Sequence, residues 1–293
     1  MSDQLNNPSP SPLPVSVQAD WWLKFKRNRN AVIGSTIVGI IVLIALLSGV
    51  LPPHDYTNTN LLAVWEPPGD VYLLGADELG RDILSRLIVS TRVSLVIAMS
   101  VLSITMTVGI ILGMVAAYFG GWADAIIMRI VDVVFAFPEL IFAILIASVM
   151  GPGMTTVIVA LSLVWWPGIA RLTRSLALSI RDELYVDAAI VSRTPSWVIL
   201  RRHILPNIVA PLIVRGSVGV GFIITAEATL SFLGIGVQEP LPSWGGMIRD
   251  GLVSLRLDPY LAIFSSCALG ITIIGFNLLG DGLRDIFDPK GNQ

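Results

Sequence analysis

The sequence predicts an all-α polytopic membrane protein with six transmembrane helices and both termini in the cytoplasm. Of its 293 residues, 54% are hydrophobic and only 14% are charged, whereas an ordinary soluble domain carries about 25% charged residues. The mean hydropathy is +0.77. Several apolar runs reach the roughly 20 residues that a helix needs to cross the hydrocarbon core of a bilayer. A membrane β-barrel would instead show alternating segments of about 10 residues.

The first transmembrane helix is expected over residues 31–51. It follows a flexible cytoplasmic tail, residues 1–30, whose beginning is rich in Pro, Ser and Asn. Basic residues between Lys24 and Arg29 stand directly before the apolar run, which favours a cytoplasmic start. No small-x-small cleavage site follows the run, so we interpret it as an uncleaved span rather than a signal peptide.

An extracytoplasmic segment, residues 52–92, follows the first span. Within it, Asp77–Leu87 (DELGRDILSRL) is expected to form a short amphipathic helix at the membrane interface. A core with five transmembrane helices then occupies residues 93–280, and 281–293 form a cytoplasmic tail. The spans expected in this core are 93–118, 131–150, 154–170, 208–232 and 261–280. Gly109 and Gly113 form a GxxxG pair that would let another helix approach closely.

The distribution of basic residues agrees with this topology. Roughly two thirds of the 19 Lys and Arg residues fall in segments expected inside, as the positive-inside rule requires. Six arginines lie in the long cytoplasmic loop 171–207 alone. The loop is therefore the most basic inner segment of the chain.

The catalytic motifs that the chain lacks argue against an enzyme. Its lysines are Lys24, Lys26 and Lys290, none preceded by glycine, so it has no P-loop to hold the phosphates of a nucleotide. Two histidines and Cys267 are too few for the usual His/Cys metal site. No GxSxG nucleophile motif is present either. We expect a non-catalytic chain that binds no metal, cofactor or nucleic acid itself.

Four charged residues fall inside expected spans, where charges are costly and often functional. Asp132 and Arg215 are interpreted as side chains that reach the inner interface. Glu139 and Glu227 lie deeper and are candidates for a translocation path, with contact to a neighbouring helix as the alternative. Pro138 and Pro167 are expected to kink their helices.

The stretch Tyr185–Pro206 (YVDAAIVSRTPSWVILRRHILP) stands out within the long inner loop. Its small Ala188-Ala189 surface, its Pro195 turn and its paired Arg201-Arg202 suit either a docking site for an acidic partner or an amphipathic helix on the membrane surface. The residues alone leave both interpretations open.

This stretch resembles the coupling loop of ABC importer permeases. The family pattern begins with Glu-Ala-Ala, places Gly six residues after the Glu, and ends near Leu-Pro. The chain has Asp in place of the Glu and Arg193 in place of the glycine. Because a positive φ is costly for any residue other than glycine, we expect Arg193-Thr194-Pro195 to make the turn another way. The resemblance assigns to the ATPase-coupling loop Asp187, Ala188, Ala189, Arg193, Pro195, Trp197, Arg201, Arg202, Leu205 and Pro206.

Four further stretches resemble the C-type subunit of the dipeptide/oligopeptide/nickel branch of that family. They are GADELGRDILSR (75–86), EATLSFLGIG (227–236), PSWGGMI (242–248) and FNLLGDGLRDIFDPK (276–290). The first is similar to a Gly-Thr-Asp-x-x-Gly-Arg-Asp signature, with Ala76 for Thr. Its signature residues are Gly75, Asp77, Gly80, Arg81, Asp82 and Arg86.

The resemblance implies the type I ABC importer permease (MetI-like) fold in a bacterial inner membrane. It also implies four partners: a homologous B-type permease subunit, two cytoplasmic ATP-binding subunits that use ATP and Mg²⁺, and an extracytoplasmic solute-binding protein. Di- or oligopeptides are the expected solutes, among a group that includes glutathione, opines and nickel chelates. An ion-coupled secondary transporter is the alternative, although no internal duplication of the kind common in such proteins is evident.

Overall fold

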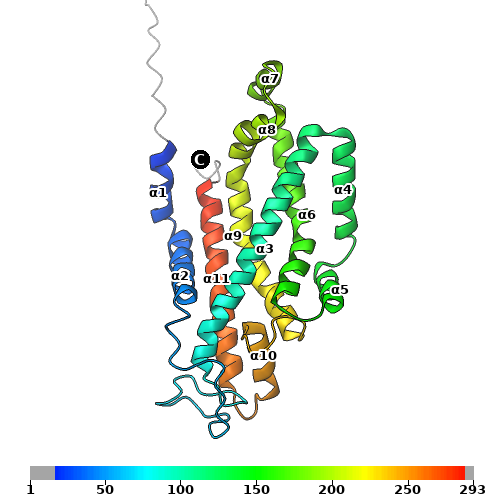
Figure 1. The fold of residues 1–293 in the computed structure, drawn as a ribbon. Helices are drawn as coiled ribbons and strands as arrows, with labels where there is room; N and C mark the ends of the chain where they lie inside the picture. Colours follow the sequence, from blue (N-terminus) through cyan, green and yellow to red (C-terminus); the bar gives the residue numbers. More distant parts are fainter. Residues whose placement is uncertain (1–16, 288–293) are drawn as a thin grey trace, which may run out of the picture.

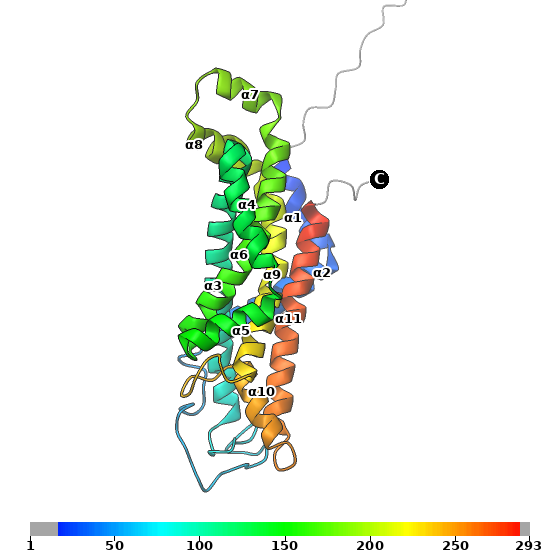
Figure 2. The same cartoon turned by 90° about the vertical axis from the view of Figure 1, so that its right-hand side faces the viewer.

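The computed structural model describes residues 17–287, and these are almost entirely helical (Figures 1 and 2). The elements are α1 (Val17–Arg27), α2 (Arg29–Leu46), α3 (Ile83–Phe119), α4 (Gly121–Phe135), α5 (Glu139–Met150), α6 (Met154–Arg181), α7 (Leu184–Val191), α8 (Ser196–Ile199), the π-helical turn η1 (Leu200–Ile204), α9 (Leu205–Phe232), α10 (Trp244–Val253) and α11 (Tyr260–Phe287). Among these residues the β-structure is one isolated bridge, Ala76 to Asp82. The all-α prediction is confirmed.

Five continuous stretches in the described residues are long and apolar enough to span a membrane. They contain α2, α3, α6, α9 and α11. The sixth expected span, 131–150, is not one helix, because α4 and α5 meet at 88° across a break of three residues. Pro138 explains the break: it disfavours helical backbone at the preceding Phe137, and its own ψ of 127° leaves the helical region. Six spans result if the bent pair crosses the membrane as one unit.

The prediction of a short interfacial helix over Asp77–Leu87 is wrong. Helix α3 begins at Ile83 and continues unbroken through 37 residues. Asp82 caps it, because its side chain accepts a hydrogen bond from the backbone N–H of Ser85. The amphipathic pattern of 77–87 therefore combines a buried turn with the first turn of a long helix.

The long helices form a bundle in which α3 packs along α6, and α11 packs against α2 and α9 (Figure 1). Gly109 and Gly113 make the close approach of α3 possible. A Cβ atom at Gly109 would lie 2.6 Å from Cβ of Ile169, and one at Gly113 would lie 2.5 Å from the carbonyl oxygen of Ala170. The GxxxG pair thus serves a contact within this chain.

The ends of the chain differ from the expected tails. Residues 17–27, assigned to a flexible tail, form helix α1, and α11 continues past residue 280 to Phe287. Residues 1–16 and 288–293 of the two tails lie outside the described residues. The described ends, α7 and α8 lie at one end of the bundle, and the 52–82 segment and α10 lie at the other (Figures 1 and 2).

Candidate functional site

The 185–206 segment forms a helical hairpin at one end of the bundle. Helix α7 lies beyond the ends of α3 and α6, and α8 with η1 returns the chain to α9 (Figure 2). Leu205 and Pro206 open α9, where proline is tolerated because the first turn needs no donor from its backbone. The short helices α7 and α8 are separated by a turn over residues 192–195, where the sequence predicted one at Pro195.

Arg193 makes this turn with a left-handed backbone, at φ +57°. The expectation that Arg193-Thr194-Pro195 would avoid this conformation is wrong. The N–H of Arg193 donates to Ile190 O at 2.9 Å, and the N–H of Thr194 donates to Ala189 O at 3.0 Å. These bonds constitute a Schellman motif that terminates α7, with Arg193 at the position where glycine is usual. The motif therefore tolerates arginine at the cost of backbone strain.

A buried apolar cluster fastens the segment to the bundle. Val186, Ile199 and Ile204 have no exposed surface and belong to a cluster that includes Ala117 of α3 and Ala177 of α6. Because packed interiors deform little, a force on the hairpin would move the ends of α3, α6 and α9 with it. The segment is mechanically continuous with three transmembrane helices.

The opposite face of the hairpin carries exposed apolar and charged side chains. Leu184 is 85% exposed, Val191 82% and Trp197 65%. Asp187, Ala188, Arg201 and Arg202 are also exposed, and Ala189 is half-buried. A surface hollow of about 430 Å³ is lined by Trp197, Val198, Arg201, Arg202 and Pro206. Large exposed apolar groups with a charged rim are typical of a protein interaction surface.

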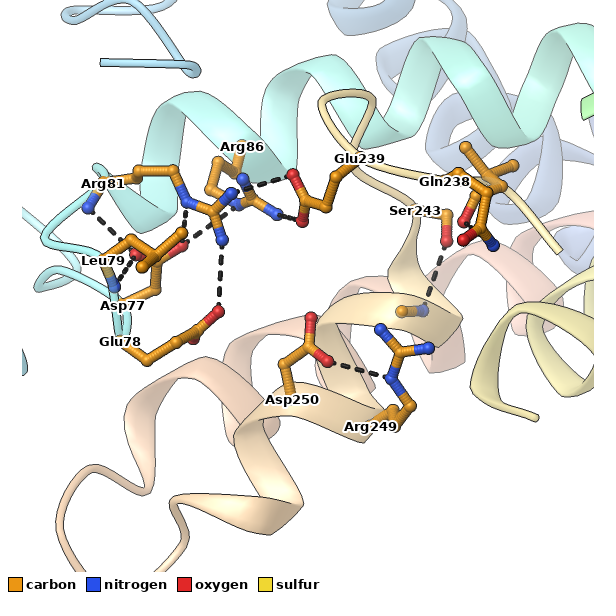
Figure 3. Close-up of polar contacts among 12 residues, drawn as sticks. Asp77, Glu78, Leu79, Arg81, Arg86, Gln238, Glu239, Ser243, Arg249 and Asp250 are labelled. Carbon is orange, nitrogen blue, oxygen red and sulfur yellow. Dashed lines mark hydrogen bonds and ion pairs between the residues drawn. The ribbon is translucent and has the colours of Figure 1, made fainter. Parts of the chain in front are cut away.

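At the other end of the bundle, five charged residues form an external ion-pair cluster: Asp77, Glu78, Arg81, Arg86 and Glu239 (Figure 3). Arg81 donates to Asp77 at 2.7 Å, to Glu78 at 3.1 Å and to Glu239 at 2.8 Å. Arg86 donates to the second oxygen of Glu239, also at 2.8 Å. Glu239 therefore joins the segment before α10 to the start of α3.

Glycines at two signature positions give this cluster its backbone shape. Gly75 and Gly80 have φ of +88° and +69°, which other residues rarely adopt. A Cβ atom at Gly80 would lie 1.8 Å from Asn60 O, so a side chain is also excluded by space. The turn directs the carboxylate of Asp77 at its own loop, where it accepts from the N–H groups of Leu79 and Arg81. The signature is a buried structural turn.

The carboxylates of the external cluster differ in electrostatic setting. Partial burial works to raise the pKa of Glu239, but the hydrogen bonds and charges of Arg86 and Arg81 outweigh it and hold that pKa below its ordinary value. Burial, with the neighbouring Asp77 charge, raises the pKa of Glu78. Glu239 thus bridges the two arginines as a carboxylate whose ionised form they stabilise.

The two acidic candidates for a translocation path occupy different places. Glu139, at the start of α5, lines a cavity between α3, α6 and α9. Glu227 is fully buried in the packing of α9 and accepts hydrogen bonds from Ser94 at 3.0 Å and Ser231 at 2.8 Å. It does not line this cavity, and it holds α9 against α3. Ser94, missed by sequence reasoning, carries no pattern that would have revealed this role.

Two family models match the chain. Residues 109–292 match the family described as binding-protein-dependent transport system inner membrane component. Residues 16–68 match the N-terminal TM domain of oligopeptide transport permease C. Together the two matches cover the hairpin of residues 185–206 and the first transmembrane helix.

Curated relatives resemble the chain over nearly its full length. The glutathione transport system permease protein GsiD of Pectobacterium atrosepticum is 41% identical, covering 95% of each chain. The oligopeptide transport system permease protein OppC of Bacillus subtilis is 37% identical, covering 94% of this chain and 90% of its own length. The dipeptide transport system permease protein DppC of Alkalihalophilus pseudofirmus is 35% identical, with 99% and 96% covered.

A solved structure shares the fold. A chain of the MetNI methionine ABC transporter, in inward-facing conformations, superposes with a TM-score of 0.52 at 16% identity. The match covers 70% of this chain and 96% of that one. At this identity the likeness concerns the fold alone, and it confirms the expected type I importer permease architecture.

Proposed function

This chain belongs to the family of binding-protein-dependent transport system inner membrane components, and we propose from that premise that it imports peptides with ATPase subunits docked on its 185–206 segment. As a member of this family it is a transmembrane permease subunit of an ABC importer. The functional roles of its residues, its partners and its solute are parts of the proposal.

The single observation that carries the ATPase-docking proposal is the two-sided construction of the hairpin. Its buried side is packed into the ends of α3, α6 and α9. Its exposed side offers large apolar groups, such as Leu184 and Trp197, beside Arg201 and Arg202. A helix that only rested on lipid would need the exposed groups but not the packed attachment to three spans.

At the opposite end, residues 52–92 and 233–260 would meet the solute-binding protein in the extracytoplasmic space. The external ion-pair cluster supports this, because Glu239 ties the two segments into one surface. A homologous B-type permease would complete the path across the membrane, which on this proposal is a bacterial inner membrane. The ATPase partners, rather than this chain, would use ATP and Mg²⁺.

Short peptides are the proposed solutes. The relatives named above are permeases for dipeptides, oligopeptides and glutathione, which share amide bonds and charged amino and carboxylate groups. Solute choice would rest largely with the separate binding protein.

Reconstitution of the complete complex into proteoliposomes tests the proposal. Uptake of a labelled dipeptide should require ATP and the binding protein, and reversal of both Arg201 and Arg202 to Glu should abolish it. Ala188→Pro should do the same, because proline inside α7 removes a helix hydrogen bond and clashes with the preceding turn. Arg256→Glu, an exposed charge reversal at the other end of the bundle, is the control for ATPase attachment alone and should leave that attachment unchanged, since its segment is proposed to meet the binding protein.

Co-purification of the ATPase subunits separates the possible outcomes. Loss of these subunits from the double arginine variant, with normal levels of this chain in the membrane, is the expected result. Normal attachment and normal uptake by both hairpin variants would disprove the docking role.

A further inference from the structure

A cavity of about 310 Å³ lies among the transmembrane helices. Its walls come from α3, α6 and α9, and from the bend between α4 and α5, which contributes Phe135 and Glu139. The volume is at the lower end of the roughly 300–1,000 Å³ found for small-molecule sites. The lining is mixed, with aromatic and aliphatic side chains, Thr105 and two charged residues. A small, partly polar solute fits such a site.

The two charges, Glu139 and Arg215, are opposite in sign and lack ion-pair partners. Both side chains are exposed in the subunit, and neither has an opposite charge within 4.0 Å in the described part of the chain. Each would cost roughly 2.5–3.5 kcal/mol at the centre of a bilayer. The helix dipole of α5 favours Glu139 at its first position, but it offers nothing to Arg215, which lies well inside α9.

Two ion pairs join α4 to α6. Asp132 of α4 accepts from Arg171 of α6 at 2.7 Å, and the guanidinium of Arg171 lies 4.5 Å from the ring centre of Phe135. Asp124 and Arg174 form a second ion pair between the same two helices. These four groups therefore have partners of opposite charge within the subunit, whereas Glu139 and Arg215 have none in the described residues.

Glycine keeps the α9 wall of the cavity open. Gly216 and Gly219 both line it, and a Cβ atom at Gly219 would have no atom within 4 Å outside its own helix neighbourhood. A larger side chain at Gly219 would occupy the cavity without a clash of its Cβ against the protein. Glycine is not required here for backbone freedom, because α9 is helical throughout this stretch.

We propose that this cavity holds a short peptide in transit, with Arg215 binding its carboxylate and Glu139 binding its amino group. Arginine matches the geometry of a carboxylate with paired N–H donors, and a carboxylate accepts hydrogen bonds from an ammonium group. The inference rests on the proposed peptide transport and adds a recognition site in the membrane path, separate from the binding protein. Pairing of the two charges with the partner permease is the competing explanation.

The first experiment blocks or neutralises the cavity in the reconstituted complex. Arg215→Gln and Glu139→Gln should each lower uptake of alanyl-alanine by about tenfold or more, the factor for loss of one charge-assisted hydrogen bond. Gly219→Leu should also lower uptake, because its side chain would fill the cavity. Gly39→Leu is the matched control, because Gly39 is also a helical glycine with open space but does not line the cavity. Stoichiometric co-purification of all subunits must accompany each measurement.

The second experiment observes the peptide in the cavity without the binding protein. Cys267 is the only cysteine, so Gly219→Cys in a Cys267→Ser background provides a single thiol in the cavity wall. Millimolar alanyl-alanine should slow its labelling by methyl methanethiosulfonate, whereas the C-terminal amide and the N-acetyl derivative should protect much less. Arg215→Gln should erase the difference between dipeptide and amide, and Glu139→Gln the difference between dipeptide and N-acetyl derivative.

The outcomes separate this inference from the proposed function. If the unaltered complex takes up no dipeptide, the peptide proposal itself fails. If uptake is normal but amide, N-acetyl derivative and free dipeptide protect the thiol equally, or not at all, the cavity inference alone is overturned. Loss of the partner permease from the Arg215→Gln or Glu139→Gln complex would show that these charges hold the subunits together, which also overturns it.

Discussion

Replacing Arg193 with glycine should stabilise the 185–206 hairpin. At φ +57° an L-residue carries a cost of roughly 1–2 kcal/mol, which glycine does not have. Glycine loses about 0.5–1 kcal/mol more backbone entropy on ordering. The net gain is about 0.5–1 kcal/mol, or about a two- to fivefold shift in the local opening equilibrium.

Amide hydrogen exchange measures this shift directly. The reporter is the N–H of Thr194, which donates to Ala189 O across the turn. Its exchange should slow about two- to fivefold in Arg193→Gly, since exchange from the native state follows local opening. Arg193→Asn should fall between, because asparagine tolerates the left-handed region better than most residues.

Two controls isolate the backbone effect. Arg193→Ala removes the guanidinium but keeps the strained φ, so exchange at Thr194 should stay close to that of the unaltered chain. Ser192→Gly should accelerate exchange, because Ser192 has an ordinary φ of −72° and its hydroxyl donates to Ala188 O at 2.8 Å. Faster exchange in Arg193→Gly, or equal slowing in Arg193→Ala, would refute the strain argument. In either case the arginine side chain, and not the backbone φ, would control the stability of the turn.

Three further predictions follow from packing and charge. Gly113→Val should lower the melting temperature of the complex and separate α3 from α6, because its Cβ would meet Ala170 O at 2.5 Å; an unchanged melting temperature would contradict the packing. Glu227→Ala should destabilise more than Glu227→Gln in denaturant titrations, because alanine leaves two buried serine hydroxyls without their acceptor, at about 1–3 kcal/mol each; equal effects would show that the hydroxyls find other partners. Glu239→Gln should cost about 1–2 kcal/mol at neutral pH, after allowance for its half-exposed side chain. The pKa of Glu239 is lowered in the folded state, so its carboxylate stabilises the fold above the unfolded-state pKa of 4.5 and loses that effect as pH falls through the folded-state pKa. The melting curves of the unaltered protein and Glu239→Gln should therefore converge in acid. A constant difference down to the lowest pH would exclude the ion pair as the cause.

Much of the fold follows from local sequence pattern. Long apolar runs predict spans because the transfer of each residue from water into hydrocarbon depends mainly on its own side chain and little on tertiary contacts. The break between α4 and α5 was also signalled locally, by Pro138, although its 88° angle was not. Gly109 and Gly113 predicted a close helix contact, while only the packed bundle identified α6 as the partner.

Of the two candidate sites, one could be predicted from local sequence and the other only in part. The 185–206 segment could be found from its motif, since its helices and turn are formed by neighbours in sequence. The cavity could be found only in part, because Glu139 was a candidate whereas Arg215 was assigned to the interface. Nothing in the sequence indicates that α5 and α9 bring these two charges to one cavity.

By itself, the sequence determined that the chain is a helical membrane protein, where most of its spans lie, and which hairpin resembles a docking site. The tertiary structure alone decided that Arg193 accepts a left-handed backbone, that Glu239 bridges Arg81 and Arg86, and that Glu227 is satisfied by Ser94. The physical reason is distance along the chain. Hydropathy and turn chemistry act between near neighbours, whereas these ion pairs and hydrogen bonds join residues more than a hundred positions apart and exist only after the helices have packed; at Arg193 the surrounding contacts hold a conformation that local preference disfavours.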